Sequence, residues 1–161
     1  LNKEFFLLDD AYPNLFIKIL KILSEEFNNI KILVKPHPVT RTHILDDCLR
    51  RLNNKNIEVT YLHPNLLAYN AKFFITELYS TVITDAHLLG LTTIEFSNYK
   101  ESVLKKTNRG SIGGKYVDFF INNDEDKLRN LLKNLKSEKE FSLSNINRDT
   151  EDQLKLLQAI S

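Results

Sequence analysis

Two short segments of this 161-residue chain carry side chains suited to binding phosphate. The first is Lys35-Pro36-His37-Pro38. Proline fixes its own φ angle and biases the residue before it toward extended backbone, so the two prolines hold the His37 imidazole in place. An imidazole N–H donates to a phosphate oxygen, and Lys35 adds positive charge. We therefore expect a phosphate ligand here; the alternative is a rigid turn in which His37 only caps the next helix.

The second segment is Tyr79-Ser80-Thr81, at the predicted start of a helix. The amino terminus of a helix offers unpaired N–H groups and the positive end of the helix dipole, and the two hydroxyls add further donors for a phosphate. A plain N-cap role for Ser80 is the alternative. The neighbouring carboxylates are Glu77 and Asp85, and either suits a ribose hydroxyl. For Asp85 the alternative is an interaction with the helix dipole.

Both segments stand where a predicted strand gives way to a predicted helix. Apolar and β-branched runs predict strands over residues 4–8, 30–34, 57–60, 73–76, 92–96 and 117–121. Helical spacing of apolar residues predicts helices over 13–27, 44–52, 64–69, 80–89 and 124–135. Such an alternation predicts an α/β fold, namely a doubly wound, Rossmann-like and mostly parallel sheet of about six strands with helices on both faces. In that fold ligands bind beyond the carboxyl ends of the strands, where both segments stand.

The length of the chain fits one domain. We expect a nucleotide-binding domain over residues 1–135, a polar linker over 136–148, and a carboxyl-terminal helix over 149–161 that packs on the same domain. The chain contains no methionine and begins at Leu1, which suggests a piece of a longer protein.

Composition narrows the classes of function. Lys plus Arg number 22 against 21 for Asp plus Glu, and this net charge of +1 gives no overall field for nucleic acid, so no nucleic-acid partner is predicted. Cys48 is the only cysteine, so an intrachain disulfide is impossible and a reducing cytoplasm is a compatible location. No apolar run approaches the ~20 residues of a membrane span. The four histidines lack metal-ligand spacing, so no metal site is predicted.

The sequence lacks three loop motifs that are common in nucleotide-binding proteins and hydrolases. The run from Gly110 to Lys115 differs from a Walker loop, because Arg109 stands where glycine is needed and Tyr116 where Ser or Thr is needed. The chain has neither a G-x-G-x-x-G turn nor a G-x-S-x-G elbow. Dinucleotide oxidoreductases and α/β-hydrolases are therefore not predicted.

The run Ile32-Leu33-Val34-Lys35-Pro36-His37-Pro38, with residues 74–90 following about 40 residues later, resembles the carboxyl-terminal half of bacterial GT-B glycosyltransferases of surface polysaccharide synthesis. The similarity is greatest to sialyltransferase-like and polysialyltransferase-like enzymes, which carry a His-Pro motif and a Ser-Ser or Ser-Thr motif. CDP-glycerol glycerophosphotransferases have a similar pair of motifs. Their Asp-Tyr-Ser-Ser arrangement is one residue shorter than the segment from Glu77 to Thr81, which favours the sialyltransferase-like enzymes.

The resemblance implies one half of a GT-B fold and a role for each motif. His37, Ser80 and Thr81 would hold the phosphate of a nucleotide donor, and His37 would also act in catalysis by stabilising the departing phosphate. With the neighbours singled out above, the predicted donor-binding set is Lys35, His37, Pro38, Glu77, Ser80, Thr81 and Asp85. The implied donor is a CMP-linked acidic sugar of the sialic-acid type, with no metal and no further cofactor.

The resemblance also implies a second domain and a cellular location for the enzyme. In these families the general base comes from an amino-terminal domain that this chain lacks, so a glycan acceptor would bind through that domain. It implies a cytoplasmic bacterial enzyme that associates peripherally with the inner membrane face. Three other hypotheses remain open: a CDP-glycerol glycerophosphotransferase-like domain, a UDP-sugar epimerase-like fragment, and a non-catalytic α/β binding module with an exposed apolar patch.

Overall fold

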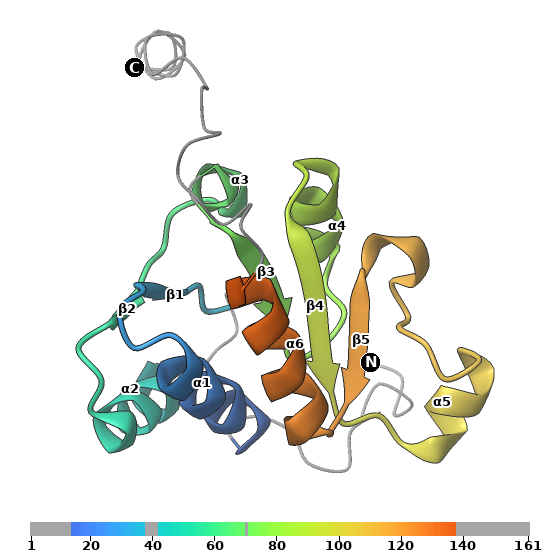
Figure 1. Cartoon of the computed structure of the whole chain (residues 1–161), viewed down its shortest axis with the longest axis horizontal. Helices are drawn as coiled ribbons and strands as arrows, with labels where there is room; N and C mark the ends of the chain where they lie inside the picture. Colours follow the sequence, from blue (N-terminus) through green and yellow to red (C-terminus); the bar gives the residue numbers. More distant parts are fainter. Residues whose placement is uncertain (1–13, 38–41, 70, 138–161) are drawn as a thin grey trace, which may run out of the picture.

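The computed structural model describes residues 14–37, 42–69 and 71–137. Helices and strands alternate along them (Figure 1). In chain order the elements are α1 (Asn14–Glu26), β1 (Ile32–Val34), α2 (Thr42–Leu52), β2 (Ile57–Val59), α3 (Pro64–Ala68), β3 (Phe73–Thr76), α4 (Thr81–Leu88), β4 (Thr92–Ser97), α5 (Glu101–Lys106), the short 3-10 helix η2 (Gly114–Tyr116), β5 (Phe119–Asn122) and α6 (Glu125–Ser137). The predicted α/β class is therefore confirmed.

The strands form two parallel sheets. β1 pairs with β2, with Ile32 opposite Ile57. The larger sheet has the order β3-β4-β5, with Ile75 opposite Ile94 and Ile94 opposite Phe119. A parallel connection needs a crossover, and a helix lies between each pair of consecutive strands in these sheets.

This arrangement corrects one sequence prediction. The described residues form five strands in two sheets, and the single doubly wound sheet of about six strands is not observed. The hydrogen-bonded order of strands is interrupted between β1 and β3, because no described strand pairs with both of them. The strand predicted over residues 4–8 lies outside the described residues. The other five predicted strands are present, each within about two residues of its predicted bounds.

The main core lies between α1, α6 and the larger sheet. Figure 1 shows α6 running alongside β4 of that sheet. The cluster joins buried residues of α1, β4, β5 and α6 with Phe27: Leu15, Ile19, Ile22, Leu23, Phe27, Ile94, Phe96, Ile121, Leu128, Leu132 and Leu135. A second cluster, of Leu20, Val34 and Leu45, ties α1 to β1 and α2. Helix α1 therefore contributes to the cores of both sheets.

Strand β4 is buried on both faces, and its two faces differ in chemistry. Because successive side chains of a strand alternate, Ile94 and Phe96 face α1 and α6. Thr93, Glu95 and Ser97 face the other side, and all three are fully buried. A polar face on a central strand needs internal hydrogen-bond partners. Loops at both edges of the sheet supply them, with Tyr116 and Asp118 bonding Thr93 and with Ser111 bonding Glu95.

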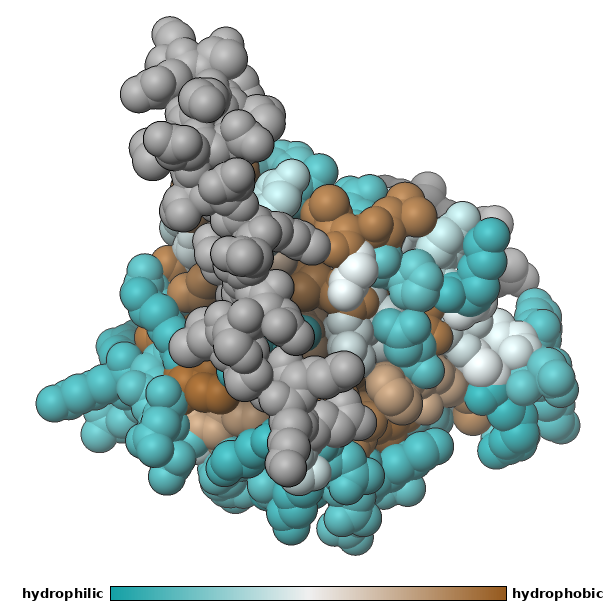
Figure 2. Space-filling view, turned by 45° about the horizontal axis from the view of Figure 1, so that its top comes forward, coloured by the Kyte–Doolittle hydropathy of each residue, from teal (hydrophilic) through white to brown (hydrophobic). Residues whose placement is uncertain are grey.

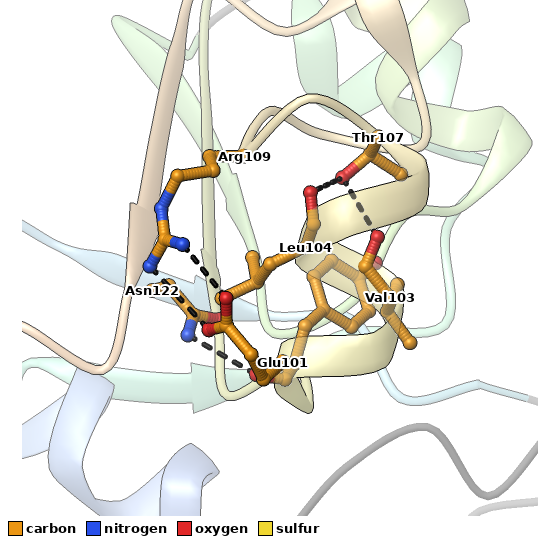
Figure 3. Close-up of polar contacts among 7 residues, drawn as sticks. Glu101, Val103, Leu104, Thr107, Arg109 and Asn122 are labelled. Atoms are coloured by element: carbon orange, nitrogen blue, oxygen red, sulfur yellow. Dashed lines mark hydrogen bonds and ion pairs between the residues drawn. The ribbon is translucent and has the colours of Figure 1, made fainter.

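Helix α5 has no counterpart among the helices predicted from periodicity. Its six residues are too few to show a clear apolar stripe. Figure 3 shows how its end is held: the Thr107 hydroxyl lies 3.2 Å from the Val103 carbonyl oxygen, and Arg109 pairs with Glu101 at 2.8 Å. Arg109 has a φ of 58°. This left-handed residue turns the chain back after the helix.

The carboxyl-terminal boundary also differs slightly from the prediction. Helix α6 runs to Ser137, so the first two residues of the predicted linker over 136–148 are helical. The rest of that linker and the predicted helix over 149–161 lie outside the described residues. No helix among the described residues is long and apolar enough to cross a membrane.

The burial of α6 gives a direct test of this core. Leu132 is 0 % exposed, whereas its neighbour Leu131 is only partly buried. We expect Leu132→Ala to lower the free energy of unfolding by about 2–5 kcal/mol, because it leaves a cavity between α6 and β4. The control Leu131→Ala should cost clearly less. Chemical denaturation measures both, and equal losses would show that α6 is not seated as described.

Candidate functional site

The first predicted phosphate-binding segment follows the carboxyl end of β1. Val34 ends the strand and is buried, whereas His37 is exposed at the surface. The Lys35 ammonium donates to the Pro36 carbonyl oxygen at 3.1 Å, which holds the lysine stem along the turn. Pro38 lies outside the described residues. The structure thus places Lys35 and His37 at the strand end where the sequence predicts them.

The second segment begins α4 as predicted. Ser80 is the N-cap residue, with an extended backbone of φ −137° and ψ 148°. Its carbonyl accepts from the Ile83 N–H at 2.9 Å, but its side chain makes no capping hydrogen bond. Thr81, the first residue of the helix, is exposed. The ordinary capping alternative for the Ser80 hydroxyl is therefore not what the structure shows.

Asp85 is exposed and is the fifth residue of α4. The first turn of this helix holds no acidic residue. Favourable interaction of a carboxylate with the helix dipole is confined to that first turn. The dipole alternative for Asp85 therefore finds no support, whereas a ligand contact at the surface stays a prediction.

Glu77 directly follows β3 and has an unusual environment. One of its carboxylate oxygens, Oε2, is buried and has no hydrogen-bond partner within the described part of the chain. Burial raises the pKa of Glu77 to about 7, because desolvation disfavours the charged form. A carboxyl group that keeps its proton near neutral pH can donate as well as accept. Perturbed groups of this kind cluster at functional sites.

An electrostatic effect links the turn after β3 to the smaller sheet. Burial is the main cause that raises the pKa of the Cys48 thiol, and the negative charge of Glu77 also contributes. Cys48 lies in α2, the helix that follows the His37 turn. The contribution of Glu77 is the smallest of the causes, after burial and the charges of Arg51 and Asp47.

A buried polar network missed by the sequence analysis supports the same edge of the larger sheet. The Ser97 hydroxyl lies 2.8 Å from Glu95 Oε1 and 2.9 Å from the Glu77 carbonyl oxygen. The Ser111 hydroxyl donates to the other Glu95 oxygen. The Tyr99 phenol hydrogen-bonds to Glu95 as well, and burial together with this bond raises the pKa of Tyr99 above its ordinary value. The buried Glu95 carboxylate is thus hydrogen-bonded by three hydroxyl groups, which replace the water it would contact at the surface.

This network reaches the Ser80 segment through backbone contacts. The Tyr79 N–H lies 3.4 Å from the Tyr99 hydroxyl oxygen. Asn122 at the end of β5 fixes Tyr99 in turn, because its Oδ1 accepts from the Tyr99 N–H at 2.6 Å. The signal for this network was present in the sequence as Glu95, a carboxylate in the middle of an otherwise buried strand. Glutamate is almost never fully buried unless it is paired.

A packing contact holds the Tyr79 side chain. A β-carbon built on Gly113 would lie 2.5 Å from Cδ2 of Tyr79 and 2.9 Å from Cγ2 of Val117. The Tyr79 hydroxyl lies 3.3 Å from the Thr84 hydroxyl of α4. Only glycine allows the loop after α5 to approach the ring this closely. The ring therefore anchors the residues that precede Ser80.

The opposite, amino-terminal edge of the larger sheet carries a shallow hollow of about 400 Å³. Its lining residues are His87, Gly90, Leu91, Thr92, Asp118 and Phe119. His87 pairs with Asp118 at 3.4 Å, and Asp118 accepts from the Thr93 N–H at 2.7 Å. This hollow lies away from the strand ends at which α/β folds bind ligands. Within the described ranges, no cluster of three or more metal-ligating side chains is present.

Comparisons with known proteins identify no relative: no family model, curated protein or solved structure matches this chain. The resemblance carried by the His37 and Ser80 segments therefore stays a prediction. What the structure adds is that both segments stand at carboxyl strand ends and that Glu77, between β3 and Ser80, is buried with an unpaired oxygen.

The raised pKa of Glu77 predicts a pH-dependent stability. The unfolded carboxyl loses its proton near pH 4.5 and the folded one near pH 7, so the folded state holds more protons between these values and stability falls as pH rises through that window. Glu77→Gln removes this penalty, on the order of 3 kcal/mol at pH 8, and has little effect near pH 4. Denaturation across pH 4–8 measures the difference. The control Asp85→Asn, at an exposed site within α4, should keep the wild-type pH profile. A Glu77→Gln profile that matches wild type would contradict this account.

The contact between Gly113 and Tyr79 predicts a coupled pair of substitutions. Gly113→Ala should cost about 1–3 kcal/mol of stability, because the new methyl group overlaps the ring. Gly110→Ala is the control, since its β-carbon would meet only the Thr107 carbonyl, at 3.3 Å. In a Tyr79→Ala background the cost of Gly113→Ala should fall in a double-mutant cycle, and the part that remains reflects the contact with Val117 at 2.9 Å. Additive losses would show that the ring does not pack on Gly113.

Proposed function

We propose that this chain is the donor-nucleotide-binding domain of a GT-B glycosyltransferase, and that it binds the phosphate of a nucleotide sugar at the carboxyl ends of β1 and β3. The observation that carries the proposal is the Ser80 hydroxyl, which stands at the amino terminus of α4 and makes no capping bond. A hydroxyl at that position makes no capping hydrogen bond, and it stands at the helix end whose N–H groups bind anions.

In this proposal each segment contributes differently to phosphate binding. The backbone N–H groups of α4 and the hydroxyls of Ser80 and Thr81 donate hydrogen bonds to the phosphate oxygens at the positive end of the helix dipole. His37 and Lys35 approach from the turn after β1 and add charge-assisted hydrogen bonds. Pro38 restricts the backbone of His37.

Glu77 and Asp85 occupy the ribose side of the proposed site. A Glu77 carboxyl that keeps its proton up to about pH 7 does not repel a neighbouring phosphate as a carboxylate would. It also donates or accepts a hydrogen bond with a ribose hydroxyl. Raising the pH through 7 should therefore weaken donor binding.

The proposed reaction is an inverting displacement. The acceptor hydroxyl oxygen attacks the anomeric carbon, the bond from that carbon to the phosphate oxygen breaks, and the bonding pair leaves with the nucleotide phosphate. His37 and the amino terminus of α4 stabilise that departing charge. The proton of the acceptor goes to a general base, which in the resembling families belongs to a second domain, and the acceptor glycan binds there.

The finer parts of this proposal rest on the resemblance alone. They are a CMP-linked acidic sugar as donor, one half of a GT-B fold with a doubly wound sheet, synthesis of a bacterial surface polysaccharide or lipooligosaccharide, a cytoplasmic site of action, peripheral association with the inner membrane face, and no metal. A CDP-glycerol donor or a UDP-sugar epimerase reaction would use the same phosphate-binding segments.

A specific observation favours a second candidate function, a non-catalytic binding module. Figure 2 shows hydrophobic residues in the middle and toward the top of the face in view, with hydrophilic residues along the rim. Four large hydrophobic residues in and around α3 are notably exposed: Tyr61, Leu62, Leu66 and Tyr69. Such residues mark contact surfaces when they lie together. A binding module would use them and would have no affinity for nucleotides.

Calorimetric titration with CMP, CDP, UDP and GDP tests the proposal. We expect saturable binding of a cytidine nucleotide, weakened about tenfold by His37→Ala and by the double variant Ser80→Ala with Thr81→Ala, because each removes a charge-assisted hydrogen bond. His43→Ala and Ser102→Ala replace the same residue types at exposed positions in other elements and should bind as wild type does. A folded chain that binds no nucleotide would contradict the proposal and favour the binding module.

A further inference from the structure

A hollow of about 440 Å³ lies beside the last turns of helices α1 and α2. Figure 1 shows the two helices side by side, and the cluster of Leu20, Val34 and Leu45 joins them. Small-molecule sites are commonly hollows of roughly 300–1,000 Å³ with a few convergent polar groups. This hollow has that size, and most of its lining side chains are polar: Lys21, Ser24 and Glu25 of α1, with Arg51 and Leu52 of α2.

The two cations of the hollow differ from the neighbouring cations of the same helices. Lys21 and Arg51 form neither a hydrogen bond nor an ion pair within the described part of the chain. Lys18, one turn earlier in α1, is ion-paired with α6, and Arg50, next to Arg51, is ion-paired within α2. The last turn of a helix favours a cation, but that interaction leaves the guanidinium donors of Arg51 unfilled. Both cations are therefore available to an anion in the hollow.

The carboxylate among the lining residues does not cancel these charges. Glu25 Oε2 lies 2.6 Å from Nη2 of Arg129, which belongs to α6. Arg129 Nη1 also lies 3.4 Å from Oε1 of Glu26. Three cations thus stand against two carboxylates around the hollow, so a net positive charge remains there. A partly enclosed positive surface of this kind attracts anions.

A hydroxyl group of the lining is buried without a partner. A serine within a helix usually donates to the carbonyl oxygen four residues earlier or points to solvent. Ser24 does neither, because its Oγ is buried and makes no hydrogen bond to any described residue. It therefore has no hydrogen bond to lose by turning toward a ligand, and a new bond would remove the cost of leaving it unsatisfied.

We propose that this hollow between α1 and α2 binds a phosphate group, free or carried by a small molecule, through Lys21, Ser24 and Arg51. The planar guanidinium of Arg51 matches two phosphate oxygens, the Lys21 ammonium adds a second positive charge, and Ser24 donates from its hydroxyl. Leu52 offers an apolar wall to the organic part of a phosphomonoester. These residues stand near the ends of their helices, whereas the proposed nucleotide site uses the turns that follow strands, so this site is independent of the proposed function.

An NMR titration of the full chain with inorganic phosphate, at constant ionic strength, tests the proposal. We expect saturable shifts of the backbone amides of residues 21–25 and 51–52, with a Kd on the order of 1 mM. A parallel titration with glycerol phosphate identifies the source of the group. Tighter binding than that of inorganic phosphate assigns the site to a phosphomonoester, and equal binding assigns it to free phosphate. Amides that shift with neither probe would overturn the proposal.

Matched substitutions separate a specific site from the general attraction of an anion to a basic surface. Arg51→Gln and Lys21→Gln should each weaken phosphate binding about tenfold, because each removes a charge-assisted hydrogen bond. The controls Arg50→Gln and Lys18→Gln remove the same charges from the same helices, and screening should keep their effect below about twofold. Equal weakening by the paired and the unpaired cations would overturn the proposal.

Ser24→Ala gives a test that does not alter charge. It should weaken phosphate binding about threefold. Without phosphate it should unfold at no lower denaturant concentration than wild type, because its hydroxyl has no hydrogen bond to lose. Unchanged phosphate affinity would overturn the assignment of this hydroxyl to the site. His37→Ala alters the nucleotide site proposed above and should leave the shifts of residues 21–25 unchanged, so the two proposals succeed or fail separately.

Discussion

The burial of β4 on both faces is the constraint on which the rest of the structure depends. On one face Ile94 and Phe96 are covered by α1 and α6, and the same cluster extends to β1 through Ile32. On the other face Glu95 is fully buried and takes hydroxyl partners from Ser97, Ser111 and Tyr99. An unpaired carboxylate at that depth would cost several kcal/mol, roughly 3–5 by comparison with other broken buried pairs. The loops that supply these hydroxyls are therefore fixed by the strand that they cover.

That requirement positions the candidate site. Ser97 contacts the Glu77 carbonyl, and Tyr99 contacts the Tyr79 N–H, so the residues that satisfy Glu95 also hold the turn that leads into α4. The two glutamates differ in how fully their carboxylate oxygens are hydrogen-bonded. Glu95 has three hydroxyl partners, whereas the Glu77 carboxylate leaves a buried oxygen without one. The Glu95 carboxylate is thus paired, whereas the unpaired Glu77 oxygen lies directly after the carboxyl end of β3.

Most of the element order could be predicted from the sequence, because the strands are short apolar runs and five of the six α-helices carry apolar stripes or N-cap signals. The division into two sheets could not be predicted, since periodicity gives the elements and not their pairing. Helix α5 was missed because six residues hold too little periodicity. The segments around His37 and Ser80 were found from residue type and proline placement. The Glu95 network was missed because its partners come from β4 and two different loops, and only folding brings them together.

The proline and serine segments are about 40 residues apart in sequence, and parallel pairing explains why both stand at carboxyl strand ends. Each crossover helix returns the chain to the amino edge, so every strand delivers its following turn to the same side of its sheet. This holds separately for β1 and for β3. What relates the two turns to each other is α1, whose residues contribute to the cores of both sheets. A substitution that loosened α1 would therefore disturb the relative placement of the His37 and Ser80 turns without touching either of them.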